Sequence, residues 1–221
     1  SEIRALQNQI NAHFIYNVLE SIKMMAEIDE EYDISDAVTS LGKLLRYSMK
    51  WVSGNVLVEQ ELEYIKNYMA LINLRFDYEI YLSLNLPEII LQQEIPKMSL
   101  QPIVENSFVH GMRGMDELFI VCLSAKGIRD EQGKLSEMIL SVEDNGIGMD
   151  EEAVERLTKG KRTEPDEKDR KKVFRNIGVP NIIERLKMLY GDRAKLTVTS
   201  GENGTTIQIR LPADGEKKEI I

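Results

Sequence analysis

The first quarter of the chain has a helical pattern of apolar residues. Apolar side chains recur every three or four positions in residues 1–28 and again in 34–51, which predicts two amphipathic helices joined by the acidic turn DEEYD at 29–33. Two such helices cannot cover their own apolar stripes, so we expect them to pair with a second copy as a four-helix bundle. The first stripe comprises Ile3, Leu6, Ile10, Phe14, Val18, Ile22 and Met25.

The remainder of the chain mixes helical and alternating patterns. The expected helices are 58–76, 96–112, 150–160 and 179–192, and the expected strands are 79–86, 118–125, 137–145, 195–200 and 205–212. Hairpin connections are expected at 127–134 and 201–204. This mixture predicts an α+β fold, with a helical-hairpin dimerisation module at 1–57, a two-layer α/β sandwich at 58–213 and a solvated tail at 214–221.

Composition narrows the classes of function. The formal charge of −9 argues against direct nucleic-acid binding, which requires a basic face. The single cysteine, Cys122, excludes an internal disulfide framework and is expected to be a small core residue. No apolar run reaches the roughly 20 residues that span a bilayer, and no signal peptide is visible. The opening SEIRALQNQ lacks an initiator Met and is already helical, so we expect a piece of a longer protein.

The segment EDNGIGMD at 143–150 is the strongest local candidate for chemistry. A strand delivers Asp144, whose carboxylate can accept a hydrogen bond from an exocyclic amine such as that of adenine. Gly146 and Gly148 follow, where the backbone can turn sharply and approach a ligand closely. The alternative is a tight Asn-Gly turn without a ligand.

Three further segments add polar groups and glycines. QPIVENSFVHG at 101–111 carries Glu105, Asn106 and His110 on one helix, and the Asn106 amide oxygen suits Mg²⁺. The alternative is a polar outer face above Ile103, Val104 and Phe108. NIGVPN at 176–181 opens a helix whose N–H groups could hold phosphate, and NGTT at 203–206 follows a glycine turn.

In this order the four segments resemble the motifs of GHKL-type ATPases, the group that includes histidine kinases, Hsp90, MutL and type II topoisomerases. With NAHFIYN at 11–17, ELEYIKNYMALINLRF at 61–76 and IIERLKMLYG at 182–191, the chain resembles sensor histidine kinases of the LytS/YesM type over about residues 5–212. The resemblance implies ATP and Mg²⁺ as cofactors, a response regulator receiver domain as partner, a homodimer through the N-terminal helices, and a cytoplasmic fragment whose full-length protein sits in the bacterial membrane through an upstream anchor.

The resemblance also implies roles for residues. His13 is expected to accept phosphate, with Asn17 orienting its imidazole and Glu105 accepting a proton; Asn106 is expected to bind Mg²⁺, and Asp144 to read adenine. Residues 159–177, rich in Lys and Arg, would form a lid over the phosphates, and the region 51–60 a hinge. The remaining expected nucleotide-binding residues are His110, Gly146, Gly148, Met149, Gly178, Asn181, Gly204 and Thr205.

Several alternatives stay open at this point. His13 could be an exposed histidine without a role, Glu105 a surface acid, His110 a capping or packing residue, and the charged segment 159–177 a solvated loop.

Two positions also depart from the family pattern. Ala12 stands where a proline usually precedes the histidine, and Asn176 where a glycine usually opens the later glycine motif. These departures motivate a second hypothesis, a nucleotide-binding signalling scaffold with weak or no kinase activity. A third, motivated by the ATP motifs alone, is an ATP-hydrolysing chaperone or repair-type protein.

Overall fold

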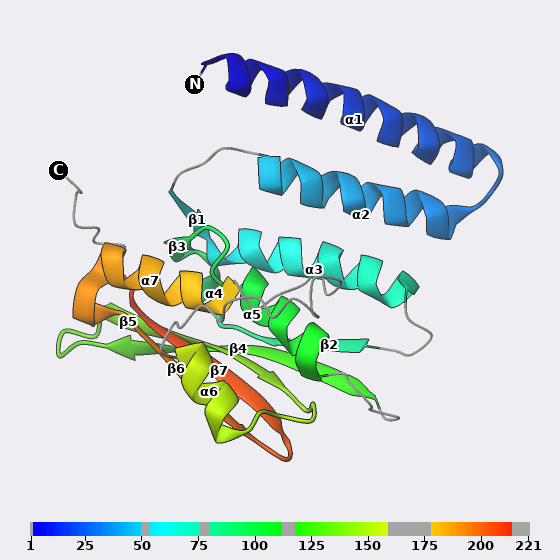
Figure 1. The fold of residues 1–221 in the computed structure, drawn as a ribbon. Coiled ribbons are helices and arrows are strands. Elements are labelled where there is room, and N and C mark those ends of the chain that lie inside the picture. The colour runs from blue at the N-terminus through cyan, green and yellow to red at the C-terminus, as the bar shows by residue number, and fades with distance from the viewer. Residues whose placement is uncertain (1, 50–53, 76–79, 112–117, 159–177, 214–221) are drawn as a thin grey trace. The chain divides into compact units, whose positions relative to one another are not determined.

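A computed structural model describes residues 2–49, 54–75, 80–111, 118–158 and 178–213, which Figure 1 draws as ribbon. The chain divides into two compact units, one of Ser1–Ser53 and Glu63–Tyr78, the other of Gly54–Leu62 and Glu79–Ile221. Helix α3 (Val58–Arg75) therefore contributes residues to both units. The boundary predicted at residue 57 stays a prediction.

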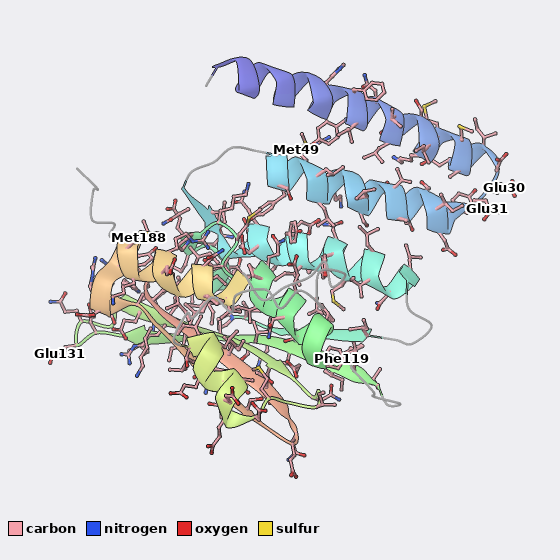
Figure 2. All side chains as sticks on the ribbon, in the orientation of Figure 1. Glu30, Glu31, Met49, Phe119, Glu131 and Met188 are labelled. Carbon is pink, nitrogen blue, oxygen red and sulfur yellow. The ribbon has the colours of Figure 1, made fainter. Side chains whose placement is uncertain are left out.

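The first unit contains the two predicted N-terminal helices, α1 (Glu2–Ile28) and α2 (Tyr32–Met49). The turn between them is shorter than the DEEYD segment, because Tyr32 and Asp33 already belong to α2. Glu30 takes a left-handed backbone conformation (φ 59°), and the Glu31 N–H donates to the Ala26 carbonyl over 2.8 Å. Figure 2 labels Glu30 and Glu31 at this bend.

Helix α1 contacts α2 through a face other than its most apolar stripe. The Arg46 guanidinium lies 5.5 Å from the centre of the Tyr16 ring, Ala26 is buried, and the Ser35 hydroxyl donates to Glu27 over 3.2 Å. The predicted stripe stays largely exposed where its side chains are described, and Phe14 is 68% exposed. In this unit the stripe therefore remains available to pack against a partner surface, as expected.

The second unit is built on a five-stranded sheet. Its strands are β2 (Ile80–Asn85), β4 (Phe119–Arg129), β5 (Leu135–Asp144), β6 (Lys195–Gly201) and β7 (Gly204–Pro212), in the order β2-β4-β5-β7-β6. Strand β2 runs parallel to β4, and the other neighbours are antiparallel. Two short strands, β1 (Asn55–Leu57) and β3 (Glu94–Pro96), form a separate antiparallel pair that the sequence pattern did not predict.

Helices cover one face of this sheet. Figure 1 shows α5 (Gln101–Asn106) and α7 (Gly178–Tyr190) over that face, and α6 (Glu151–Thr158) packs against β6 and α7. Short elements complete the unit: α4 (Glu88–Leu91), a π-helical turn (Ser107–Gly111) and a 3₁₀ turn (Gly191–Arg193). The expected two-layer arrangement is present.

Alternation along the strands separates a core face from an outer face. Phe119, Val121 and Leu123 of β4 are buried, and the ring of Phe119, labelled in Figure 2, meets that of Phe108 edge-on with centroids 5.9 Å apart. Cys122 points to the opposite face and is half-buried. The expectation of a core cysteine was wrong, because a period of two places residue 122 opposite its buried neighbours.

The segment predicted as one helix at 96–112 is instead composite. Residue 96 ends β3, Met98 has a left-handed backbone (φ 61°), and α5 begins only at Gln101 before giving way to the π-helical turn. The predicted loop 127–134 is also shorter, since β4 extends to Arg129 and β5 begins at Leu135. None of the helices in the described ranges combines the length and apolar character that a membrane span requires.

Candidate functional site

Asp144 stands at the end of β5 and is almost fully buried. Its Oδ1 accepts the N–H of Gly146 over 3.0 Å and of Thr205 over 3.3 Å, and the Ser107 hydroxyl bonds to the same carboxyl. Burial raises the pKa of this carboxyl, and the three hydrogen bonds partly oppose that rise. The carboxyl is therefore held in one orientation by neighbours from three segments.

Gly146 approaches another backbone rather than open space. A Cβ built at Gly146 would lie 2.5 Å from the Cα of Gly111, and the Ile147 N–H donates to the Gly111 carbonyl over 3.2 Å. The sequence predicts a sharp turn and a close approach to a ligand at this glycine. In the structure its visible reason is packing of the segment after β5 against the π-helical turn after α5.

Gly148 and Gly204 have left-handed backbones, with φ of 71° and 119°. A Cβ at Gly148 would lie 1.8 Å from the Gly201 carbonyl oxygen, and one at Gly204 would lie 1.9 Å from the Asp144 carbonyl oxygen. Only glycine combines that conformation with that approach. These contacts bring the β6–β7 hairpin against the segment that follows Asp144.

Two serines that the sequence motifs did not predict join this arrangement. The Ser200 hydroxyl accepts the Met149 N–H over 2.8 Å and lies 2.8 Å from the Thr205 hydroxyl. Ser107, the residue after Asn106, bonds to Asp144. Ser107 lies inside the motif at 101–111, so its position could have marked it as a candidate. Ser200 lies just before a turn, and no motif marks it.

Asn145 has a structural role beside the site. Its Oδ1 accepts the Ile120 N–H over 2.7 Å, and its Nδ2 donates to the Leu118 carbonyl over 2.9 Å. This amide therefore ties the start of β4 to the end of β5.

Helix α5 carries the next two predicted residues, Glu105 and Asn106, both half-exposed. Burial raises the pKa of Glu105, and a hydrogen bond from Gln101 Nε2 to its Oε1 (2.8 Å) opposes that rise. His110 lies in the π-helical turn, so the α-helical spacing assumed between Asn106 and His110 does not apply. The side chain of His110 lies outside the described residues.

Gly178 is the first residue of α7, and a Cβ there would lie 2.5 Å from the Cβ of Pro102 in α5. This contact joins the start of one helix to the start of the other. Asn181 is exposed in the first turn of α7. Asn176 and the predicted lid at 159–177 lie outside the described residues.

His13 belongs to the first unit, on an exposed part of α1. The amide nitrogen of Asn17 lies 3.4 Å from its Nδ1, so the pair meets across one helical turn as expected. The side chain of Ala12 lies outside the described residues.

The arrangement in the second unit fits a nucleotide with its metal. A buried, fixed carboxyl suits the amine of an adenine, and Asn106 offers a neutral oxygen of the kind that Mg²⁺ accepts beside phosphates. The N-terminus of α7, a helix of 13 residues, offers N–H groups for phosphate.

Two family models match the chain. A histidine kinase model matches residues 1–80, and the model of the histidine kinase-, DNA gyrase B- and HSP90-like ATPases matches residues 94–215. The chain belongs to this ATPase family. The predicted GHKL-type fold is therefore confirmed, and the kinase model extends the match to the helices that precede the ATPase domain.

Similar proteins agree with this membership. The chain is 33% identical over 217 residues to the sensor histidine kinase YesM of Bacillus subtilis (strain 168), covering 98% of this chain and 34% of YesM. It is 29% identical over 219 residues to the sensor protein LytS of Oceanobacillus iheyensis, covering 99% of this chain and 35% of LytS. The predicted resemblance to LytS/YesM kinases is confirmed, and the chain spans about a third of the length of these relatives.

A solved structure supports the fold as well. The histidine kinase domain of a blue-light activated kinase from Erythrobacter litoralis matches with a TM-score of 0.52 at 17% identity, covering 96% of this chain and 94% of that domain.

Proposed function

We propose that this chain is the catalytic region of a sensor histidine kinase of a two-component system. It would transfer the γ-phosphoryl group of ATP to His13, from which an aspartate of a response regulator receiver domain would receive it. The observation that carries the proposal is the buried Asp144 carboxyl, fixed by Gly146 and Thr205, in a chain whose upstream helix exposes a histidine beside an asparagine.

At the ATP site, the predicted residues divide into those that bind adenine, magnesium and phosphate. The Asp144 oxygen accepts the exocyclic amine of adenine, and the segment Gly146–Met149, with Gly204 and Thr205, forms the wall around it. Asn106 holds Mg²⁺, which supplies charge neutralisation on the phosphates. Gly178, Asn181 and His110 are the proposed contacts for the phosphate chain.

At the histidine end, the Asn17 amide selects which imidazole nitrogen attacks. With its NH₂ group toward Nδ1, as in the structure, Nδ1 is an acceptor and Nε2 keeps its proton. Turning the amide by half a rotation places its oxygen toward Nδ1–H and leaves the Nε2 lone pair available. We propose that the second arrangement is the reactive one.

In the transfer step, the Nε2 lone pair forms a bond to the γ-phosphorus while the bond to the β–γ bridging oxygen breaks, and ADP leaves with that electron pair. Phosphorylation at Nε2 leaves an imidazolium whose proton is on Nδ1; that proton leaves its bond to the Asn17 oxygen, and Glu105 accepts it. Since His13 and Glu105 belong to different units, the region 51–60 would act as the hinge that lets them meet.

The exposed stripe of α1 is the proposed surface for a homodimer. A second copy would cover Phe14, Val18, Ile22 and Met25 and complete a four-helix bundle. We place this region of the protein in the cytoplasm and any membrane anchor in a segment upstream of it.

The decisive experiment is labelling with γ-³²P-ATP and Mg²⁺. We expect acid-labile label on the wild type, no label on His13→Gln, and normal label on the control Glu20→Gln, which changes an exposed side chain of the same helix. Nucleotide binding by His13→Gln would establish that its ATP domain is intact. Acid-stable label, or label that persists in His13→Gln, would overturn the proposal.

A further inference from the structure

Glu61 of α3 is completely buried, and both its carboxylate oxygens bind the same loop of the second unit. Oε1 accepts the Met98 N–H over 2.5 Å, and Oε2 accepts the Leu100 N–H over 3.1 Å. Burying a carboxylate is costly, and an apolar residue at such a position often gives the more stable protein. Stability alone is therefore a weak reason for an acid at this position.

The other side of the loop is held from α7. Arg185 Nη2 donates to the Met98 carbonyl over 2.9 Å and to the Ser99 hydroxyl over 3.3 Å, and that hydroxyl donates to the Pro96 carbonyl over 2.6 Å. Met98 also has a φ of 61°, a conformation that non-glycine residues adopt only at a cost. The loop is thus held in an unfavourable conformation by side chains from two helices.

This loop ends where α5 begins. The carbonyl of Leu100 accepts the N–H groups of Ile103 and Val104, each over 3.1 Å, which makes Leu100 the N-terminal cap of the helix. The N–H of the same Leu100 is the one that Glu61 binds. A direct chain of hydrogen bonds therefore runs from Glu61 through Leu100 to the first turn of a six-residue helix that ends at Asn106.

We infer that Glu61 is a positioning residue for the magnesium-bound nucleotide, acting through Leu100 on the placement of Asn106. The inference rests on the proposed function for the role of Asn106. A helix this short has little stability of its own, so the contacts at its start contribute to its direction, together with its packing. A misplacement of about 1 Å at a reacting group can cost up to about a hundredfold in rate.

The substitution Glu61→Gln keeps the shape but replaces one acceptor by an NH₂ group that faces a backbone N–H. The matched control is Glu59→Gln, the same chemical change on the exposed side of the same helix, where the carboxylate accepts Gln92 Nε2 over 3.0 Å. Hydrogen exchange of the nucleotide-free proteins tests the placement directly. We expect faster exchange at residues 98–106 in Glu61→Gln, unchanged exchange at 143–146, and no change in Glu59→Gln.

Nucleotide binding then tests the consequence. For Glu61→Gln we expect ATP affinity with Mg²⁺ to fall about tenfold, while ADP affinity in EDTA changes less than about twofold. Adding Glu61→Gln to Asn106→Ala should have little further effect on Mg²⁺-dependent binding. Equal losses with and without Mg²⁺, or unchanged exchange at 98–106, would overturn the inference. Absence of phospho-histidine in the wild type would instead count against the proposed function, because neither measurement here requires phosphoryl transfer.

Discussion

The backbone of Gly148 packs directly against the carbonyl oxygen of Gly201, so closely that a Cβ at residue 148 would lie 1.8 Å from that oxygen. Gly133 has a similar left-handed backbone (φ 79° against 71°), but a Cβ there would meet nothing within 4 Å. Alanine at Gly133 therefore measures the cost of the left-handed backbone alone, and alanine at Gly148 measures that cost plus the cost of the steric clash.

For Gly133→Ala we expect a loss of about 1 kcal/mol in the free energy of unfolding, from the φ angle alone. For Gly148→Ala we expect about 2–4 kcal/mol and weaker nucleotide binding, because the β6–β7 hairpin must move away. Chemical denaturation of both variants measures the difference. Equal losses would show that the contact with Gly201 is easily relaxed.

Asp144→Asn should separate folding from adenine recognition. The Asn oxygen can still accept the N–H groups of Gly146 and Thr205, so we expect a folded protein that has lost most of its ADP affinity. Calorimetric titration with ADP measures this loss. Retention of wild-type affinity would remove Asp144 from the adenine site.

The same variant has a predicted pH dependence. Because burial raises the pKa of Asp144 in the folded protein, its favourable contribution is present at low pH and is lost as pH rises from the ordinary aspartate range through the raised value. Relative to Asp144→Asn, the wild type should lose stability as the pH rises from below the ordinary aspartate pKa into the range above it. Unfolding curves across that range test this, and a constant difference would contradict it.

The proposed role of Glu105 as proton acceptor predicts that its ionisation controls the acidic limb of the pH profile of the transfer rate. As a proton acceptor it must be ionised, and burial raises its pKa while the Gln101 hydrogen bond opposes the rise. Gln101→Leu removes that bond and should shift the acidic limb of the profile to higher pH, whereas Glu105→Gln should abolish the limb. Single-turnover rates over pH provide the measurement. An unchanged limb in Glu105→Gln would assign it to another group.

Asn17 is expected to act through the hydrogen bond to His13 Nδ1. Asn17→Ala should lower the rate of autophosphorylation about tenfold, since the tautomer is no longer selected. Asn17→Asp should stay near the wild-type rate, because a carboxylate can only accept from Nδ1–H. ATP affinity, measured separately, should be unchanged in both. If Asn17→Asp were slower than Asn17→Ala, the proposal that the amide oxygen faces Nδ1–H in the reactive state would be wrong.

The exposed stripe of α1 predicts the effect of a charge at Val18. In a two-fold dimer Val18→Glu would place a charge at the interface from each subunit, and we expect the dimer Kd to rise about a hundredfold. Met24→Glu is the control. Residue 24 lies seven positions after Asn17 and therefore on the same helix face as Asn17, outside the apolar stripe. Sedimentation equilibrium measures both. Equal weakening by the two variants would argue against this stripe as the interface.

Local patterns in the sequence were sufficient to predict several of the elements that carry the candidate site. Helical spacing predicted α1 and α2, and it predicted that His13 and Asn17 would meet, because residues four apart on a helix are neighbours whatever surrounds them. The strand that ends at Asp144 could also be predicted from local sequence, because apolar and polar residues alternate in a strand that has one covered face. The glycine motifs were found, but the atoms those glycines approach were not.

What the tertiary structure decided are the contacts between segments far apart in the chain. Thr205 reaches Asp144 across 61 residues, and Glu61 reaches Met98 across 37. Such pairings depend on which strands and helices become neighbours, and no local periodicity encodes that choice. The sequence by itself determined the candidate residues for the chemistry, because these were named from motifs that are local in the chain. The fold alone decided that Gly146 packs on Gly111, that Ser107 and Thr205 share one carboxyl, and that a buried glutamate holds the start of α5.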